Sequence, residues 1–144
     1  MSKQQGKDQQ IEGFDFACLD TSKKAADGVE FELRHPTTGA MLDAFITVVG
    51  MDSQAHRDAR DKASEKIRRR QSEDGRRANS PSDIDDLKFE TAIGDVVGWR
   101  GILDLGEEVV FSRPNVRSMF FRFKFMVDQV GEAVYDRSRF LPGG

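Results

Sequence analysis

Few side chains in this sequence are of the types that usually perform catalysis or bind metals. Its 144 residues include one cysteine, Cys18, and two histidines, His35 and His56. A single cysteine forms no internal disulfide, and neither histidine has a second ligand at a spacing typical of metal sites. Among the many carboxylates only Asp104 and Asp128 have apolar neighbours, and both are explained more simply as turn and helix-surface residues. The sequence therefore predicts no catalytic residue, no metal, no cofactor and no enzyme activity.

Two phenylalanines are the strongest candidates for a functional surface. Residues 113–138 are predicted to form one continuous amphipathic helix of about 39 Å, whose core stripe is Val116, Met119, Phe120, Phe123, Val127, Val130 and Val134. Phe121 and Phe125 lie one turn apart, roughly opposite that stripe. Two adjacent exposed phenylalanines are unusual on a monomer and indicate a protein-binding surface. The alternative, a helix buried on all sides, is disfavoured by charged neighbours such as Arg122 and Lys124.

Trp99 is a third candidate for partner binding. It is expected at the end of a helix and just before a glycine-containing turn. An exposed tryptophan at such a place can anchor a protein interface. More often a tryptophan of this kind closes a small core and donates its indole N–H to the backbone. We favour the core role and keep the interface role as the alternative.

A basic stretch at 57–77 is the candidate for binding nucleic acid. It contains nine lysines and arginines against five acidic residues, and its densest points are Arg68, Arg69, Arg70, Arg76 and Arg77. Such clusters neutralise phosphates. However, acidic residues alternate with the basic ones, and no aromatic side chain is present to stack on a base. Mixed charge of this kind usually marks a solvated helix face, so nucleic acid is an unlikely partner.

The elements that must position these residues begin with a β-hairpin at 29–49. Apolar and charged residues alternate through 29–34, which is the period of a half-buried strand. Residues 35–39 contain the proline and glycine of a turn, and a second apolar strand follows. A lone hairpin is only marginally stable, so helices must cover it.

Three helices are expected after the hairpin. The first, at about 53–71, has only a narrow apolar stripe, made of Ala55, Ala59, Ala63 and Ile67. Helix propensity and charge pairs stabilise such a segment more than burial does. We therefore expect this helix to lie on the surface or to need a partner.

The second helix is predicted at about 83–98, and the third is the amphipathic helix already described. A capping box of Ser82 and Asp85 begins the second helix. Residues 102–111 form either a very short hairpin or an ordered loop. Ser112 then caps the third helix.

The composition fits one domain with polar extensions. The net charge is −3 and the mean hydropathy −0.57. We expect residues 1–28 to be polar and largely flexible, and 29–144 to form a single α+β domain with a flexible basic loop near 68–82. No apolar run approaches the roughly 20 residues of a membrane span, and the first ten residues do not resemble a signal peptide. The sequence therefore predicts no membrane partner.

Several short motifs together resemble those of tailed-bacteriophage tail assembly chaperones. They are the turn at 36–39, the Gly-Met-Asp-Ser start of a charged helix at 50–53, the segment 99–116, and Asp-Gln-Val-Gly-Glu-Ala at 128–133. The resemblance spans roughly residues 29–141. The basic segment at 68–82 does not match the family pattern.

This resemblance implies a role during virus assembly. Proteins of this family bind the tape measure protein, keep it soluble and help to recruit tail tube subunits. They act in the host cell cytoplasm and are usually absent from the mature virion. We also expect self-association, because the helix with the two phenylalanines has an apolar outer face. Two alternatives remain open: a basic nucleic-acid-binding accessory protein, and a structural head–tail or tail subunit of the virion.

Overall fold

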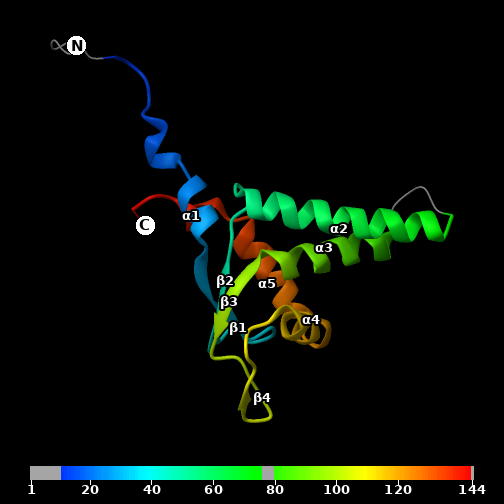
Figure 1. Cartoon of the computed structure of the whole chain (residues 1–144). Helices are drawn as coiled ribbons and strands as arrows, with labels where there is room; N and C mark the ends of the chain where they lie inside the picture. Colours follow the sequence, from blue (N-terminus) through cyan, green and yellow to red (C-terminus); the bar gives the residue numbers. More distant parts are fainter. Residues whose placement is uncertain (1–10, 76–79, 144) are drawn as a thin grey trace.

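The computed structural model describes residues 11–75 and 80–143. It combines helices with a small antiparallel sheet (Figure 1), so the predicted α+β class is confirmed. In chain order the elements are η1 (Phe16–Leu19), α1 (Ser22–Asp27), β1 (Val29–Arg34), β2 (Met41–Val48), α2 (Gln54–Glu73), α3 (Pro81–Asp95), β3 (Val96–Arg100), β4 (Leu103–Asp104), β5 (Glu107–Glu108), α4 (Arg113–Arg122), α5 (Lys124–Val134) and η2 (Arg137–Phe140). None of the described helices is long and apolar enough to cross a membrane.

The sheet has three strands in the order β1-β2-β3, and every neighbour is antiparallel. Phe31 pairs with Ile46, which in turn pairs with Trp99. The prediction that the second helix continues through residues 96–98 is wrong, because α3 ends at Asp95 and β3 follows directly. Val96 is fully buried there. By pairing with the free edge of β2, the backbone N–H and C=O groups of β3 find hydrogen-bond partners that a further helical turn would not give to β2.

Helices α2 and α3 form an antiparallel pair that extends from the sheet (Figure 1). The buried face of α2 consists of His56, Ala59, Ala63, Ile67 and Gln71, whereas Ala55 is exposed. A Cβ atom added to Gly94 of α3 would lie 2.7 Å from Cβ of Ala59. The small side chains therefore allow a close approach of the two helices. Helix α2, which was expected on the surface, is instead packed against α3. This contact buries its narrow apolar stripe.

The prediction of one continuous helix over 113–138 is also wrong. The chain leaves the helical conformation at Phe123, where φ is −121° and ψ is 77°, and α4 and α5 run in different directions (Figure 1). Phe120 of α4 and Val130 of α5 are both fully buried. The break gives each helix its own buried face, and α5 contacts α3, β1 and β2 while α4 contacts α3 and α5.

Two segments expected to be flexible belong to the folded body. Residues 22–27 form α1, in which Ala25 is fully buried and accepts a hydrogen bond from Gly50 N. The predicted basic loop at 68–82 is much shorter, because α2 continues to Glu73 and α3 begins at Pro81. Contacts between the ends of these two helices, described below, explain why they extend. Of the remaining loop, residues 76–79 lie outside the described residues.

The open alternative at 102–111 is resolved as a short hairpin. Strands β4 and β5 are antiparallel and are joined by Leu105 and Gly106, both with positive φ. This two-residue turn matches the twist of the strands. Leu105 is 98% exposed at its tip.

Candidate protein-binding groove

A groove runs between the α2–α3 pair and α4. Its first part is a hollow of about 620 Å³ between the C-terminal half of α2, the N-terminal half of α3 and the junction of α4 with α5. Its second part, of about 560 Å³, lies beside the N-terminal half of α2 and the beginning of α4. Lys66 and Glu90 line both parts. We call the two hollows together the α2–α4 groove.

One face of α4 forms a wall of this groove. Arg113 and Arg117 line the second part, and Phe121 lines the first. These three residues are spaced four apart, so they lie on one side of the helix. Phe121 is 70% exposed, and Nζ of Lys124 lies 4.6 Å from its ring centroid. An apolar ring thus stands at one end of the groove and remains open to a partner.

The other predicted phenylalanine has a different environment. Phe125 is half-buried and packs against the hydrophobic core, with its ring 6.4 Å from that of Phe123. The break at Phe123 places Phe121 on α4 and Phe125 on α5. The structure therefore does not bring the two predicted residues together as one exposed surface.

The apolar lining of the first hollow comes from four elements. It consists of Ile67 of α2, Phe89 of α3 and Val127 of α5, in addition to Phe121. Ile67 and Val127 are buried, and Phe89 is half-buried with the guanidinium of Arg117 5.8 Å from its ring centroid. Such a lining can receive apolar side chains of a partner.

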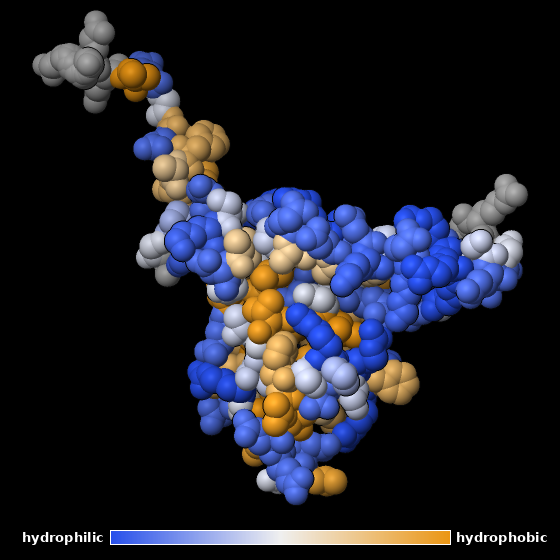
Figure 2. Space-filling model, in the orientation of Figure 1, coloured by the Kyte–Doolittle hydropathy of each residue, from blue (hydrophilic) through white to orange (hydrophobic). Residues whose placement is uncertain are grey.

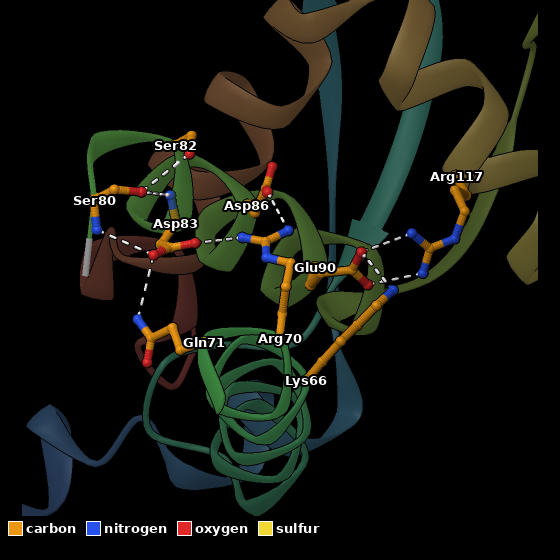
Figure 3. A network of polar contacts seen from close by, with 9 residues as sticks. All are labelled: Lys66, Arg70, Gln71, Ser80, Ser82, Asp83, Asp86, Glu90 and Arg117. Carbon is orange, nitrogen blue, oxygen red and sulfur yellow. Dashed lines mark hydrogen bonds and ion pairs between the residues drawn. The ribbon is translucent and has the colours of Figure 1, made fainter. Parts of the chain in front are cut away.

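The middle of the groove is crossed by an ion cluster of Lys66, Glu90 and Arg117 (Figure 3). Arg117 donates two hydrogen bonds to the Glu90 carboxylate, at 2.7 and 2.8 Å, and Lys66 donates a third at 3.0 Å. The hydrogen bonds from Arg117 hold the pKa of Glu90 below its usual range, against the opposing effect of burial. The cluster joins α2, α3 and α4.

A second ion cluster joins the far ends of α2 and α3 (Figure 3). Arg70 donates to Asp86 at 2.7 Å and to Asp83 at 2.5 Å. The Asp83 side chain is completely buried and also accepts a hydrogen bond from Gln71. These contacts require the two helices to continue to this point, which is why α2 and α3 replace most of the expected loop.

The capping box of α3 lies two residues earlier than predicted. Ser80 is the N-cap, and Ser80 and Asp83 exchange side-chain to backbone hydrogen bonds, in place of the predicted Ser82 and Asp85. Pro81 occupies the first turn. A proline is well placed there because its missing N–H would have no helical partner.

The arginines of the predicted basic surface are not assembled into one patch among the described residues. Arg70 is held by Asp83 and Asp86, as shown above, and Arg68 pairs with Glu65 at 2.6 Å. Arg69 is exposed. Arg76 and Arg77 lie outside the described residues.

Trp99 lies in β3 rather than at a helix end. Its Nε1 donates a hydrogen bond to the carbonyl of Val109 at 2.8 Å, and its ring meets Phe111 edge-to-face at 5.6 Å. It is half-buried against the core. Trp99 thus holds the segment that follows β5 and does not line the α2–α4 groove.

The sequence analysis missed a polar cluster in which His56 and Asp95 are buried and Tyr135 is half-exposed. Nδ1 of His56 lies 2.9 and 3.0 Å from the carboxylate oxygens of Asp95, and Nε2 lies 3.1 Å from the hydroxyl of Tyr135. Burial raises the pKa of Asp95, and the hydrogen bond from His56 opposes this shift. Burial likewise raises the pKa of the Tyr135 hydroxyl.

The cluster resembles a proton relay, and a hollow of about 720 Å³ lies beside Asp95 and Tyr135. An ionised Asp95 accepts a hydrogen bond from Nδ1–H of His56. Nε2 of this tautomer then accepts a hydrogen bond from the hydroxyl of Tyr135. Ser53, the N-cap of α2, accepts a hydrogen bond from His56 N and donates its hydroxyl to the carbonyl of Gly50. The three residues of the cluster tie together α2, α3 and the end of α5.

The sequence did contain a signal for this cluster. His56 is three residues before Ala59 and in phase with the buried stripe of α2, so a stripe begun at His56 rather than at Ala55 would have placed the imidazole in the helix interface. Its partners are 39 and 79 residues away, and nothing local identifies them. Within the described residues no group of histidine, cysteine and acidic side chains could hold a metal ion.

Comparison with known proteins finds no matching protein family, no matching curated protein and no matching solved structure.

Proposed function

We propose that this protein is a tail assembly chaperone of a tailed bacteriophage, a non-enzymatic protein that binds the tape measure protein and helps to recruit tail tube subunits. The observation that carries the proposal is the α2–α4 groove, with the exposed ring of Phe121 at one end of an apolar lining. The motifs at 36–39, 50–53, 99–116 and 128–133 supply the link to this family.

A helical client suits the groove. A tape measure protein is a long amphipathic helix, and helices of this kind place their apolar side chains into grooves between other helices. Phe121 would be the aromatic anchor of the contact, because exposed aromatic side chains contribute strongly at interfaces. The ion cluster of Lys66, Glu90 and Arg117 links α2, α3 and α4 along the groove, and the cluster of Arg70, Asp83 and Asp86 links the ends of α2 and α3.

The charged walls also serve solubility. The groove exposes one large aromatic ring among lysine, arginine and acidic side chains, so its apolar surface stays small. Larger uninterrupted apolar patches cause unspecific association. A protein built in this way can wait for its client in the host cytoplasm and need not enter the finished virion.

Capture of the client from phage-producing cells tests the proposal. The tagged wild-type protein should recover a long, helix-rich protein, identified by mass spectrometry, and the Phe121→Ser variant should recover at least tenfold less. Leu105→Ser is the matched control, because Leu105 is also an exposed apolar residue but lies in the turn of the β4–β5 hairpin. Equal circular dichroism spectra would show that all three proteins are folded. Phe125 is left unchanged because it packs against the core.

Three results would contradict the proposal. Recovery of nuclease-sensitive nucleic acid in place of a helical protein, with steep salt dependence, would favour the accessory nucleic-acid-binding protein. Presence of the protein in purified virions would favour a structural subunit. Equal capture by Phe121→Ser and the wild-type protein would show that the groove is not the client site.

A further inference from the structure

Residues 11–20, which we call the N-terminal arm, project from the body of the protein (Figure 1). Every one of these residues is exposed. The large apolar side chains of the arm, which are 48% to 95% exposed, are Ile11, Phe14, Phe16 and Leu19. Figure 2 shows them as a hydrophobic segment set off from the largely hydrophilic surface of α2. Exposed apolar side chains that lie so close together are typical of an interaction surface.

The arm has a defined local structure. Asp15 caps the short helix η1 by accepting a hydrogen bond from Ala17 N at 3.0 Å. The rings of Phe14 and Phe16 meet edge-to-face at 5.6 Å. The apolar side chains are therefore already arranged for contact, which lowers the entropic cost of binding.

The base of the arm is fixed to the body. Thr21 donates a hydrogen bond of 2.6 Å to Asp52, whose carboxylate also accepts two hydrogen bonds from Arg137. Asp20 accepts hydrogen bonds from both the backbone N and the hydroxyl of Ser22. These contacts fix the base of the arm to the body, and the apolar side chains beyond it are left exposed.

The charge of the arm complements that of the α2–α4 groove. The arm contains Glu12, Asp15 and Asp20 and no basic residue. Seven basic and five acidic side chains line the groove, although the whole chain has a net charge of −3. Among the described residues, Lys62 and Lys124 of the groove have no carboxylate partner. The groove is therefore a locally positive surface with an apolar ring at one end.

We propose that two copies of the protein form a closed dimer in which the arm of each copy occupies the α2–α4 groove of the other. Phe14 and Phe16 pack against Phe121, and the acidic residues of the arm face Lys62 and Lys124. Each aromatic side chain buries about 150–250 Å². The four phenylalanines of two reciprocal arms thus bury at most about 600–1,000 Å² of their own surface. The groove surface that they cover is buried as well, so the interface reaches the order of 1,600 Å² typical of stable complexes.

This inference shares the groove with the proposed function, and it adds a means of regulation. The arm covers the apolar groove while no client is present, and a bound client displaces it. Dimerisation and client binding then exclude each other, which is a linkage between two ligands of one site.

Sedimentation equilibrium of the purified full-length protein tests the dimer. The wild-type protein and Leu105→Ser should be dimers, whereas Phe14→Ser/Phe16→Ser and Phe121→Ser should each raise the dissociation constant at least tenfold. A mixture of the arm variant with the groove variant should recover part of the association, because that pair retains one intact arm and one intact groove. A Lys62→Glu/Lys124→Glu variant, changed only at exposed lysines, should also weaken the dimer, and high salt should weaken the wild-type dimer.

The result that would overturn the inference is a wild-type monomer, or a dimer unaffected by the arm and groove variants. The failure of one proposal can be told from the failure of the other. If Phe14→Ser/Phe16→Ser is monomeric but captures no client, the client proposal fails and the dimer stands. If the same variant is still a dimer and Phe121→Ser loses the client, the dimer proposal fails and the client proposal stands.

Discussion

Two groups of polar side chains attach α2 to the rest of the protein. The His56–Asp95 pair at its beginning is buried, whereas the ion clusters of Lys66 and Arg70 in its C-terminal half are exposed to water. His56 and Asp95 are each 3% exposed and make their contact in the interior. Lys66 and Arg70 make theirs at the rim of the α2–α4 groove, where they are 57% and 40% exposed. The same helix is thus held by an enclosed cluster at one end and by solvated ion pairs at the other.

The two groups should contribute differently to the free energy of unfolding, because one is buried and the other is solvated. Removing one member of an enclosed polar pair leaves its partner buried without a hydrogen bond, which is costly. A solvated ion pair contributes little, because water replaces the lost partner. We therefore expect the His56 cluster to determine whether the protein folds, and the ion clusters of the groove to determine its shape and its partners.

The largest effect is expected at Asp95. Asp95→Ala leaves the imidazole of His56 buried without its acceptor and should lower the free energy of unfolding by about 3–5 kcal/mol. Urea denaturation followed by circular dichroism measures the change. A loss below about 1 kcal/mol, the range of an exposed pair, would abolish the distinction between the two clusters.

Asp83 should give the next largest effect, because it is the one carboxylate of the groove clusters that is completely buried. Asp83→Ala removes the capping box and the partner of Arg70, and should lower the free energy of unfolding by about 2 kcal/mol. Asp86→Ala is the matched control, since Asp86 bonds the same guanidinium but is 46% exposed. Equal losses in the two variants would show that burial does not decide the effect.

The Asp52 contact should make stability depend on pH. Hydrogen bonds from Arg137 and Thr21 lower the pKa of Asp52 to about 2. Since the unfolded chain binds this proton more readily, the stabilisation is present above about pH 4 and is lost as the pH falls towards 2. The free energies of unfolding of the wild type and Asp52→Asn, measured as a function of pH, should therefore converge as the pH falls. Parallel curves over this range would contradict the assignment.

The smallest effect is expected for the ion pair of Lys88 and Asp128, which joins α3 to α5 at 2.8 Å. Both side chains are more than half exposed. Their coupling energy in a double-mutant cycle should be about 0.5 kcal/mol and should decrease at high salt. A coupling energy as large as the loss of unfolding free energy in Asp95→Ala would show that solvated ion pairs stabilise this fold as much as buried ones do.

Much of the local structure could be predicted, and the errors have physical causes. The start of the last helical segment was predicted at Ser112, which indeed caps α4 by accepting a hydrogen bond from Asn115 N. The helical pattern continues through Phe123, however, and only the packing of α4 and α5 in different directions shows the break. For the groove, the exposure of Phe121 was expected, whereas the burial of Phe125 depends on that break.

The sequence by itself determined the elements whose causes are local: the alternation in 29–34, the alanine-rich helix, and the Ser112 cap of α4. Only the tertiary structure decided that 96–100 joins the sheet, that Arg70 is held by Asp83, and that His56 meets Asp95 and Tyr135. Caps and periodicity act over a few residues, so they can be recognised in the chain. Burial and ion pairing depend on residues that are distant in sequence, and these meet only when the chain folds.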